Sequence, residues 1–450
     1  MLSYYFPCCN ILFFTAIHLH EIKSLSFAIL KIIYNCNNFI QMYSSIFLKE
    51  FTRSFQSSTQ KIKQKEFSKI LKLFFLLLPF FSFPTNTFAQ DSSHIRVSLL
   101  TCTPGDEVYS TFGHSALRII DSSSVTDIVF NYGTFNFDDP GFYTKFIRGK
   151  LLYFVSTDRF EDFKSQYETT NRGITEQVLN FNAAEKLAIE QFLYHNLKEE
   201  NKFYLYDFFL DNCTTRLRDI IVQHKTNYPP LKAVIPKGTR FRQAIHEYLD
   251  KNGKDWSKLA IDLLLGAPTD AVMTTEQTQF LPDILMKALD SSNQQNHLVI
   301  SSKQVYPFIA NNNKQPFFTP LLIFSFLLIS IVLLSLSANK KAIAFINSFD
   351  GLLFFITGAL GFLFVFMWAF SDHSMVKNNY NLIWAWPIHL IFSFFVSSKK
   401  QWVKNYFICT AIGLMIVLLS WFFLPQQMNN ALIPILLILI YRSIRRVQSF

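Results

Sequence analysis

Apolar residues are concentrated in two parts of the chain, and the larger part lies at the C-terminal end. From Pro316 onwards, five apolar stretches follow one another with polar segments between them: Phe317–Leu336, Leu352–Phe370, Leu382–Val396, Tyr406–Leu424 and Ala431–Tyr441. The third and fifth are shorter than the roughly 20 residues that cross a bilayer, but Trp and Tyr at their edges suit a membrane interface. We therefore predict that residues 316–450 form an all-α membrane domain of about five transmembrane helices.

A second apolar run, Leu71–Phe83, lies near the N-terminal end. It follows a basic stretch that starts at Lys61, and it precedes small and polar residues that end at Ala89-Gln90. This order is typical of a secretory signal peptide, and the run is too short to cross a bilayer. We predict that residues 61–90 are a cleaved signal peptide and favour this over an uncleaved anchor.

Residues 1–60 are unusual, because a signal peptide normally begins within a few residues of its basic region. We hypothesise that this N-terminal extension reflects a misassigned start, with translation beginning later, for example at Met42, or that the segment is removed. N-terminal sequencing of the mature protein that finds Met1 would contradict this hypothesis.

Residues 91–315 have the mixed polar and apolar pattern of an ordinary globular domain. Strand periodicity occurs at Ile95–Leu100, Ala116–Ile120, Asp127–Tyr132 and Gly149–Ser156, and a Ser-rich turn makes the middle two a hairpin. Helical periodicity occurs at Arg159–Glu168, at Ala183–Leu197 after an Asn182 cap, and at Asn212–His224, Phe241–Leu249 and Trp256–Leu264. We expect an α+β domain with helices around a small antiparallel sheet, and a strand and then a membrane tether over Asn293–Gln315.

Composition and charge agree with this division. Half of the 450 residues are hydrophobic and 51 are Phe, which argues against a wholly cytosolic globular protein. The chain has 42 Lys and Arg against 32 Asp and Glu, for a formal charge of +10. Such an excess can indicate nucleic acid, anionic lipid or the retained side of a membrane protein, so the positions of the charges decide.

The basic residues mark one side of the predicted membrane domain. They lie between the first and second apolar stretches, between the third and fourth, and after the fifth: Lys340 and Lys341; Lys399, Lys400 and Lys404; Arg442, Arg445 and Arg446. The positive-inside rule places these segments and the C-terminus in the cytoplasm and residues 91–315 outside it. We expect a multi-pass membrane protein whose residues 91–315 form an exported domain, and no nucleic-acid partner.

Two of the six cysteines, Cys102 and Cys213, lie in the predicted exported domain. Two such residues in an oxidising compartment could form a disulfide. The alternative is that Cys213 is a nucleophile, because it follows Asp211 and Asn212, either of which is a good helix N-cap. The positive end of the helix dipole would lower the pKa of this thiol, and the free N–H groups could stabilise an oxyanion.

A thiol nucleophile needs a base, and His114 is the candidate among six histidines of this domain. It follows Gly113, which allows close approach, and small residues after it lead into a predicted strand. A single histidine of this kind is more often structural. The next strand supplies Asn131, which could orient the imidazole across the hairpin. Together, Cys213, His114 and Asn131 provide the parts of a Cys-His-polar triad.

The order and context of these residues resemble known proteins. Phe-Gly-His-Ser-Ala-Leu-Arg-Ile upstream and Asp-Asn-Cys-Thr-Thr-Arg downstream are similar to the circularly permuted papain-like group that includes lecithin:retinol acyltransferase. Several motifs in order, FNYGTFNFDDPGFYTKFIRGKLLYFV, YDFFLDNCTTRLRD, FDGLLFFITGALG and NYNLIWAWP among them, resemble the Lnb-type bacterial lipoprotein N-acyltransferase family more closely. The resemblance covers about Val97 to Pro387.

The resemblance implies a permuted papain-like (NlpC-like) periplasmic domain followed by a membrane domain. It implies an enzyme that adds an acyl chain to the α-amino group of the lipidated N-terminal Cys of lipoproteins. Cys213 would be the nucleophile and His114 the base, whereas Asn131 is inferred from strand order alone. A membrane phospholipid or a lipoprotein would donate the acyl chain and a lipoprotein would accept it, with no cofactor and no metal ion.

The segment between the second and third apolar stretches contains candidate lipid-headgroup contacts, Asp372, His373, Asn381 and Trp384. The alternative is a solvated loop with ordinary interfacial anchoring. Asp350 is expected at the membrane interface. His389 falls inside the third stretch, where an ionisable residue is costly, so it could be functional or could reach a partner helix.

Two other functional classes remain open from the sequence. A Cys-His peptidase or amidase that cuts cell-wall peptides would use the same residues, but it would not require five spans. A non-enzymatic membrane-anchored protein is possible if a disulfide joins Cys102 and Cys213. Thiol alkylation under non-reducing conditions distinguishes the last class, because an oxidised Cys213 cannot be a nucleophile.

Overall fold

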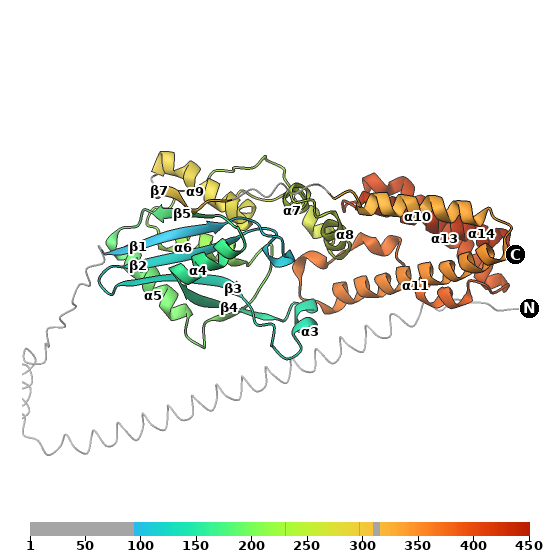
Figure 1. The fold of residues 1–450 in the computed structure, drawn as a ribbon, viewed down its shortest axis with the longest axis horizontal. Coiled ribbons are helices and arrows are strands. Elements are labelled where there is room, and N and C mark those ends of the chain that lie inside the picture. The colour runs from blue at the N-terminus through green and yellow to red at the C-terminus, as the bar shows by residue number, and fades with distance from the viewer. Residues whose placement is uncertain (1–93, 230, 297, 309–315) are drawn as a thin grey trace, which may run out of the picture. The chain divides into compact units, whose positions relative to one another are not determined.

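The computed structural model describes residues 94–229, 231–296, 298–308 and 316–450. The predicted N-terminal extension and signal peptide lie outside the described residues, and so do residues 309–315 of the predicted tether. The described part of residues 94–308 is built around a β-sheet and is called the sheet domain below. Residues 316–450 are mainly helical and are called the helical region (Figure 1).

Seven antiparallel strands form the sheet, in the order β6-β4-β3-β2-β1-β5-β7. In chain order they are β1 Ile95–Cys102, β2 His114–Asp121, β3 Thr126–Thr134, β4 Leu152–Arg159, β5 Ile174–Leu179, β6 Phe203–Leu205 and β7 Val299–Tyr306. The predicted strands and the β2–β3 hairpin are present. The strand predicted within Asn293–Gln315 corresponds to β7, and the sheet is larger than the small sheet we predicted because it also contains β5 and β6.

Strand β5 shows why the sequence pattern missed part of the sheet. Its side chains Glu176 and Gln177 are both fully buried, so the strand has no alternation of polar and apolar positions. Glu176 accepts hydrogen bonds from Arg118 at 3.2 and 3.3 Å, and Gln177 donates to the backbone oxygen of Met286 at 3.0 Å. Buried polar groups of this kind are stable only when they are paired, and the pairing partners come from other elements.

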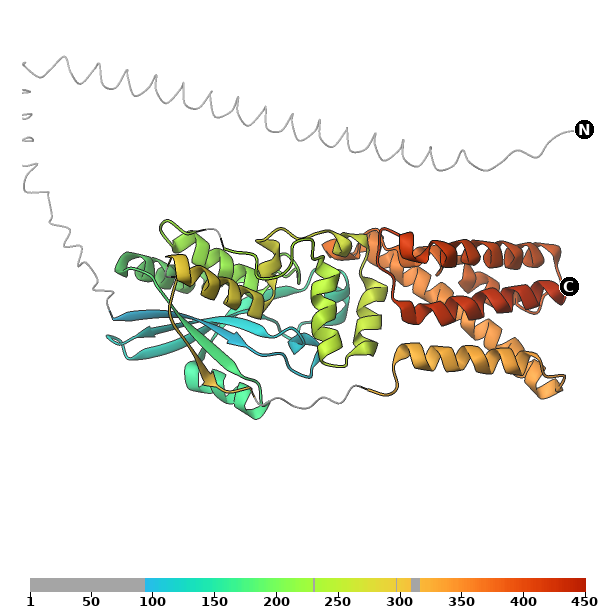
Figure 2. The same cartoon turned by 90° about the horizontal axis from the view of Figure 1, so that it is seen from above.

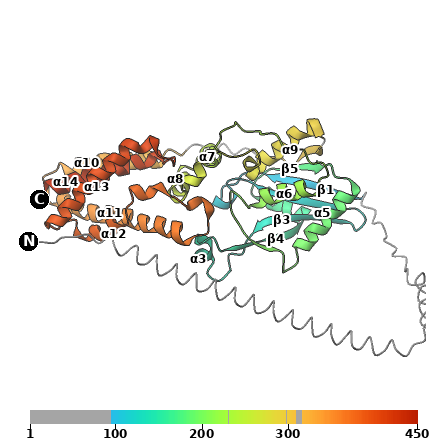
Figure 3. The same ribbon diagram turned by 180° about the vertical axis from the view of Figure 1, so that it is seen from behind.

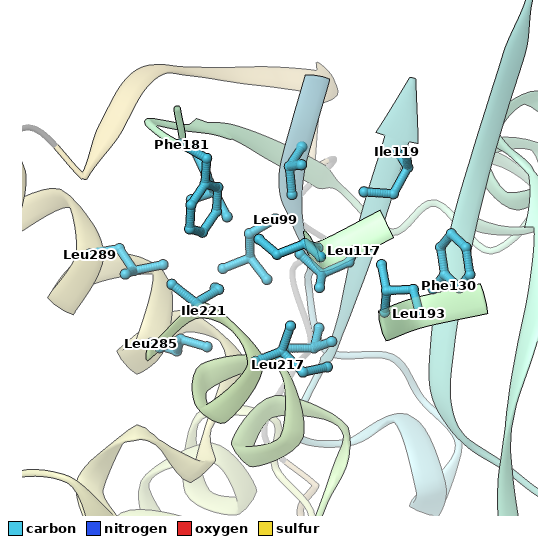
Figure 4. Packing of buried hydrophobic residues seen from close by; sticks show 14 of the residues in the cluster. Leu99, Leu117, Ile119, Phe130, Phe181, Leu193, Leu217, Ile221, Leu285 and Leu289 are labelled. Atoms are coloured by element: carbon cyan, nitrogen blue, oxygen red, sulfur yellow. The ribbon is translucent and has the colours of Figure 1, made fainter. Parts of the chain in front are cut away.

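Helices cover both faces of the sheet (Figure 2). One face carries α5 Ala183–Asn196, α6 Cys213–His224 and α9 Pro282–Asn296, and the other carries α4 Phe160–Thr169. Figure 4 shows the packing on the first face, where Leu99 and Leu117 from the strands approach Leu217 and Ile221 of α6, and Phe130 lies beside Leu193 of α5. Truncating a side chain such as Leu217 to Ala would cost about 2–5 kcal/mol.

The helices begin where their capping residues require. The Asn212 side chain accepts hydrogen bonds from the backbone N–H groups of Thr214 and Thr215, each at 2.8 Å, so α6 starts at Cys213. Asn182 caps α5 in the same way and forms a capping box with Glu185. Both helix starts agree with the sequence prediction, because a cap is a local interaction.

Three further helices complete the sheet domain. They are α3 Phe142–Ile147, between β3 and β4, and α7 Phe241–Lys251 and α8 Asp255–Leu264. The predicted helices at 241–249 and 256–264 correspond to α7 and α8. The sequence did not indicate α3, because six residues are too few to show a helical period.

The helical region contains α10 Pro320–Ser335, α11 Lys340–Phe370, α12 Ile388–Phe392, α13 Gln401–Ser420 and α14 Ile433–Gln448 (Figure 3). Within the described residues, two helices are long and apolar enough to cross a membrane: Lys340–Phe370 and Gln401–Phe423, the second being α13 with one further 3-10 turn. Helix α10 is apolar but shorter. These lengths support a membrane region and do not confirm the count of five.

The third predicted stretch, Leu382–Val396, departs most from a transmembrane helix. It contains the end of a 3-10 turn at Tyr380–Ile383, the five-residue α12 and another 3-10 turn at Ser393–Phe395. The segment packs closely against α11, since a Cβ added at Gly358 would lie 2.1 Å from the backbone nitrogen of Leu390. Its polar backbone groups are therefore covered by a neighbouring helix, which is the condition for irregular backbone at membrane depth.

Asp350, which we predicted at the membrane interface, has a side chain that is completely buried within the helical region. It accepts a hydrogen bond from Arg442 at 2.7 Å and one from Arg446 at 2.5 Å, both from α14. A buried carboxylate away from water is stable only when paired in this way. Arg442 and Arg446, which we used to predict the cytoplasmic side of the membrane domain, thus also hold α14 against α11.

Hydrogen bonds join the sheet domain to the helical region. At their centre, the fully buried Arg242 of α7 donates to Asp262 at 2.8 Å and to Asp270 at 3.1 Å. From the helical region, Asn429 donates to the other Asp262 oxygen at 2.8 Å, and Asn379 donates to the backbone oxygen of Leu263 at 2.7 Å. A buried charge network of this kind fixes the two parts against each other because each group depends on its partners.

Candidate active site

The β2–β3 hairpin brings His114 and Asn131 together. His114 is the first residue of β2, and Gly113 before it has φ +84°, with no room for a Cβ, which would lie 2.6 Å from the backbone oxygen of Cys102. His114 Nε2 lies 3.2 Å from Asn131 Oδ1. Since an amide oxygen can only accept, Nε2–H donates and Nδ1 is left as the proton acceptor of the ring.

A fourth polar residue, Asp158 on β4, extends this arrangement. Asn131 Nδ2 donates to Asp158 Oδ2 at 2.7 Å, which fixes the orientation of the amide and so of the oxygen that meets His114. Burial raises the pKa of Asp158, Asp162 raises it further, and the Asn131 hydrogen bond lowers it. The sequence reasoning missed Asp158 because the predicted strand ended at Ser156; a longer strand period would have included it.

Cys213 occupies the first position of α6 and is partly exposed. Its sulfur lies 3.8 Å from the Thr214 hydroxyl oxygen, and the His114 side chain and the Ser115 backbone N–H are close enough to influence its pKa. Burial is the largest single influence and raises the pKa, but His114, the Ser115 N–H and Thr214 together outweigh it. The pKa of Cys213 is thereby lowered to about 7.

The pKa of His114 moves in the opposite direction. Desolvation lowers the pKa of His114, whereas Cys213 and the hydrogen bond of Asn131 raise it. Because the raising influences are together larger than the lowering ones, the net shift is upward. A lowered thiol pKa beside a raised imidazole pKa is the signature of a thiolate–imidazolium pair. These two shifts favour the ionic form of the pair, in which the proton is on the imidazole and the thiol is ionised.

A polar contact also fastens the two elements that carry the pair. Ser115 Oγ and Thr214 Oγ1 are 3.1 Å apart and both side chains are buried. Because Ser115 follows His114 and Thr214 follows Cys213, this contact fixes the start of β2 against the start of α6. The thiol is thus held beside the imidazole by packing and hydrogen bonding from both sides.

Cys102 and Cys213 are both free, so the structure contradicts a disulfide between them. Cys102 is the cross-strand partner of His114, and its side chain is buried in the cluster around Phe160 and Phe163 of α4. Burial raises the pKa of the Cys102 thiol to about 12, although Tyr167 lowers it by hydrogen bonding. Cys102 is therefore a neutral core thiol.

Arg172 is a further residue near the site that the sequence did not suggest. Its guanidinium lies 4.6 Å from the centre of the Tyr167 ring, and Nε donates to the Thr103 backbone oxygen at 2.9 Å. Its charge lowers the pKa values of both Cys102 and His114, although other influences dominate each of them. Only the fold reveals Arg172, because it follows α4 and no motif surrounds it.

Two of the predicted lipid-contact residues, Asp372 and His373, lie next to α3. His373 Nε2 donates to the Phe146 backbone oxygen at 2.8 Å, and the Asp372 backbone N–H donates to the Arg148 oxygen at 2.9 Å. Both side chains are at least partly exposed. They lie just after α11 ends and do not contact Cys213.

The other two, Asn381 and Trp384, are buried, and this burial contradicts the prediction that they contact lipid headgroups. Asn381 Nδ2 donates to the backbone oxygens of Asp262 and Leu263 at 3.1 and 3.2 Å, and its Oδ1 accepts from Trp384 Nε1 at 2.9 Å. They were misread because an Asn-rich loop that fastens two parts of a protein has the same composition as an exposed loop. His389 reaches a partner helix, with Nδ1 2.5 Å from the Tyr406 hydroxyl.

Within the described residues, no group of three or more His, Cys, Asp or Glu side chains is arranged to hold a metal ion. The site instead combines a thiol with a lowered pKa, an oriented imidazole and the positive end of a helix. These are the parts that form and resolve thioesters. The fold and site together define a class of protein in which a thiol-bearing domain is joined to a membrane region.

Comparison with known families makes the assignment specific. A family model described as the Lnb N-terminal periplasmic domain matches residues 83–235, and one described as the Lnb transmembrane domain matches residues 311–449. The chain therefore belongs to the Lnb family and is a membrane protein with a periplasmic N-terminal domain. The first match includes His114, Asn131 and Cys213. Comparisons with curated proteins and with solved structures gave no match.

Proposed function

We propose that this protein is a lipoprotein N-acyltransferase that uses Cys213 as its nucleophile. The observation that carries the proposal is the contact between Cys213 and His114 at the start of α6, in a chain that belongs to the Lnb family. The C-terminus would be cytoplasmic and the protein would lie in the inner membrane, so that the thiol meets lipids of the outer leaflet of that membrane.

In the first half-reaction, the Cys213 thiolate attacks the ester carbonyl of a phospholipid or of an acylated lipoprotein. A C–S bond forms and the ester C–O bond breaks, while the alcohol leaving group takes the proton held by His114. The positive end of the α6 dipole would favour the negative charge that develops on the carbonyl oxygen. The product is an acyl-thioester on Cys213 and a lysolipid.

In the second half-reaction, the α-amino group of the lipoprotein's lipidated Cys attacks the thioester. A C–N bond forms, the C–S bond breaks, and His114 takes the amine proton, which leaves Cys213 as thiolate. Asn131 and Asp158 act as positioning residues, because they hold the ring and do not touch the reacting atoms.

The test is expression in a strain that lacks its own lipoprotein N-acyltransferase, followed by mass spectrometry of lipoprotein N-termini. Wild type should add an amide-linked acyl chain, and Cys213→Ser should not, because a hydroxyl of similar size is not ionised near neutral pH. Cys409→Ser is the matched control, since Cys409 is an exposed free thiol on α13. Equal acylation by wild type and Cys213→Ser would remove Cys213 from the mechanism.

A further inference from the structure

Helix α3 leaves an unusual number of aromatic side chains uncovered. None of its six residues is buried, although Phe142, Tyr143, Phe146 and Ile147 are all apolar or aromatic. Tyr143 is 77% and Phe146 47% exposed, and Phe137 just before the helix is 65% exposed. Hydrophobic side chains gathered on a surface in this way indicate a binding or membrane surface, because exposing them to water is unfavourable.

The position of α3 indicates what covers it. His373 and Asp372, which bond to the carbonyl groups of Phe146 and Arg148, directly follow the end of the 31-residue α11. Because α11 is a candidate membrane span, its end and the attached α3 lie at the same level, that of the bilayer surface. A short helix with exposed aromatic side chains is typical of an element that enters the headgroup region.

The aromatic side chains continue inwards from α3 as a row of five: Phe146, Phe142, Phe135, Tyr153 and Tyr206. Successive ring centres are 6.2, 6.0, 5.2 and 4.4 Å apart. We call these residues the aromatic row. Burial raises the pKa of Tyr153 to about 12 and that of Tyr206 well above its ordinary value, so the row is uncharged at neutral pH.

The inner end of the aromatic row reaches the thiol. Gly133 lies between them, since a Cβ added there would be 3.5 Å from the Tyr206 ring and 3.6 Å from Cys213 Cβ. Gly133 also has φ +89°, a conformation that disfavours a side chain. A Cβ at this position would be in van der Waals contact with both Tyr206 and Cys213, so these two residues lie close to each other on either side of Gly133.

We propose that the aromatic row binds the fatty acyl chain of a phospholipid donor and guides it from the outer leaflet to Cys213. This proposal rests on the proposed function, because it names the site for that reaction's donor. An acyl chain bound to the row would keep apolar contacts while its ester moves from the headgroup region to the thiol. The chain would therefore not be exposed to water, which is unfavourable for an apolar group.

The experiment is photo-crosslinking of the full-length protein in vesicles of phosphatidylethanolamine and phosphatidylglycerol. A small fraction of the phosphatidylethanolamine carries a diazirine in its acyl chain. The Cys213→Ser protein is used beside wild type, because it binds the chain without reacting. Crosslinks should map to the peptides that contain Tyr153 and Tyr206. Crosslinks confined to residues 316–450 would overturn the proposal.

A second measurement uses variants of the row. Tyr153→Ala should lower acylation of Cys213 by long-chain phospholipid at least about tenfold, but leave its reaction with p-nitrophenyl acetate unchanged. Tyr194→Ala, at a 43% exposed tyrosine on α5, is the matched control and should change neither. Tyr153→Leu replaces Tyr153→Ala if thermal unfolding shows that the latter does not fold. Wild-type acylation by the long-chain donor in the variant, or equal loss with both esters, would overturn the role of the row.

The two proposals fail in different ways. Crosslinks on the aromatic row in a protein whose Cys213 is never acylated would support the acyl site and contradict the acyltransferase. Transfer that requires Cys213 but produces no crosslinks on the row would support the acyltransferase and contradict the acyl site.

Discussion

Cys102 and Cys213 lie in neighbouring elements of one domain, the first at the end of β1 and the second at the start of α6, and both are free. Burial raises the pKa of each thiol. At Cys102 the opposing influences of Tyr167 and Arg172 are too weak, and the pKa reaches about 12. At Cys213 the imidazole and the nearby donors outweigh burial, and the pKa is about 7. The neighbours of a cysteine, more than the fact of its burial, thus decide whether it is a nucleophile.

The largest expected effect is on thiol alkylation. At pH 7 about half of Cys213 and about one part in 10⁵ of Cys102 would be thiolate, given pKa values of about 7 and 12. We expect iodoacetamide to modify Cys213 at least about 10³-fold faster in the folded protein, as measured by peptide mass spectrometry. Comparable alkylation rates for the two thiols, or a Cys213 that reacts only after reduction, would contradict the difference in reactivity between Cys102 and Cys213.

The pH dependence of the same reaction should depend on His114. Because its pKa is lowered, Cys213 is protonated below about pH 7 and ionised above it, so alkylation should rise through about pH 7 and then level off. His114→Gln removes the imidazolium, so the midpoint should move upward and labelling at pH 7 should fall about tenfold or more. An unchanged midpoint would show that His114 does not set the pKa of the thiol.

The N-cap of α6 tests whether the helix start holds the thiol in place. Asn212 is buried and its side chain accepts from two backbone N–H groups and donates to the backbone oxygens of Phe208 and Phe280. Asn212→Ala should lower the free energy of unfolding by about 1–2 kcal/mol, measured by chemical denaturation. Asn182→Ala, at the α5 cap, is the control: it should cost a similar amount without changing the alkylation of Cys213. Equal changes in alkylation in both variants would show that the effect is not local.

The smallest effect is expected at Asp158. Asp158→Asn keeps the size of the side chain but removes a good acceptor for Asn131, so the imidazole should be less well oriented. We expect acyl transfer to fall by about tenfold or less, through kcat more than KM, with little change in the midpoint of Cys213 alkylation. A loss as large as that of His114→Gln would mean that Asp158 has more than a positioning role.

Local interactions explain the parts of the fold that the sequence could predict. Asn182 and Asn212 are followed by helices because their side chains bond to N–H groups two and three residues away, and the β2–β3 hairpin follows from a turn between two apolar strands. The sequence also predicted helices at α11 and α13, because each contains a long apolar stretch. Each of these signals is contained in one short segment.

Other parts depend on partners that are distant in the sequence. Glu176 is charged yet fully buried in the sheet because Arg118 pairs with it, and Asp350 is charged yet lies among apolar helices because α14 supplies two arginines. Asn381 and Trp384 are buried by residues far from them in the sequence, because Asn381 donates to the backbone of α8 and Trp384 packs in the core of the helical region. No period or motif in the surrounding residues could have indicated these environments.

The candidate site divides in the same way. The sequence by itself supplied a cysteine after an N-cap, a histidine before a strand and an asparagine on the next strand. Only the tertiary structure set their separation, added Asp158, Ser115 and Arg172, and buried Cys102 away from Cys213. The physical reason is that caps and hydropathy act within a few residues, whereas a pKa depends on every charge and donor that the fold brings close.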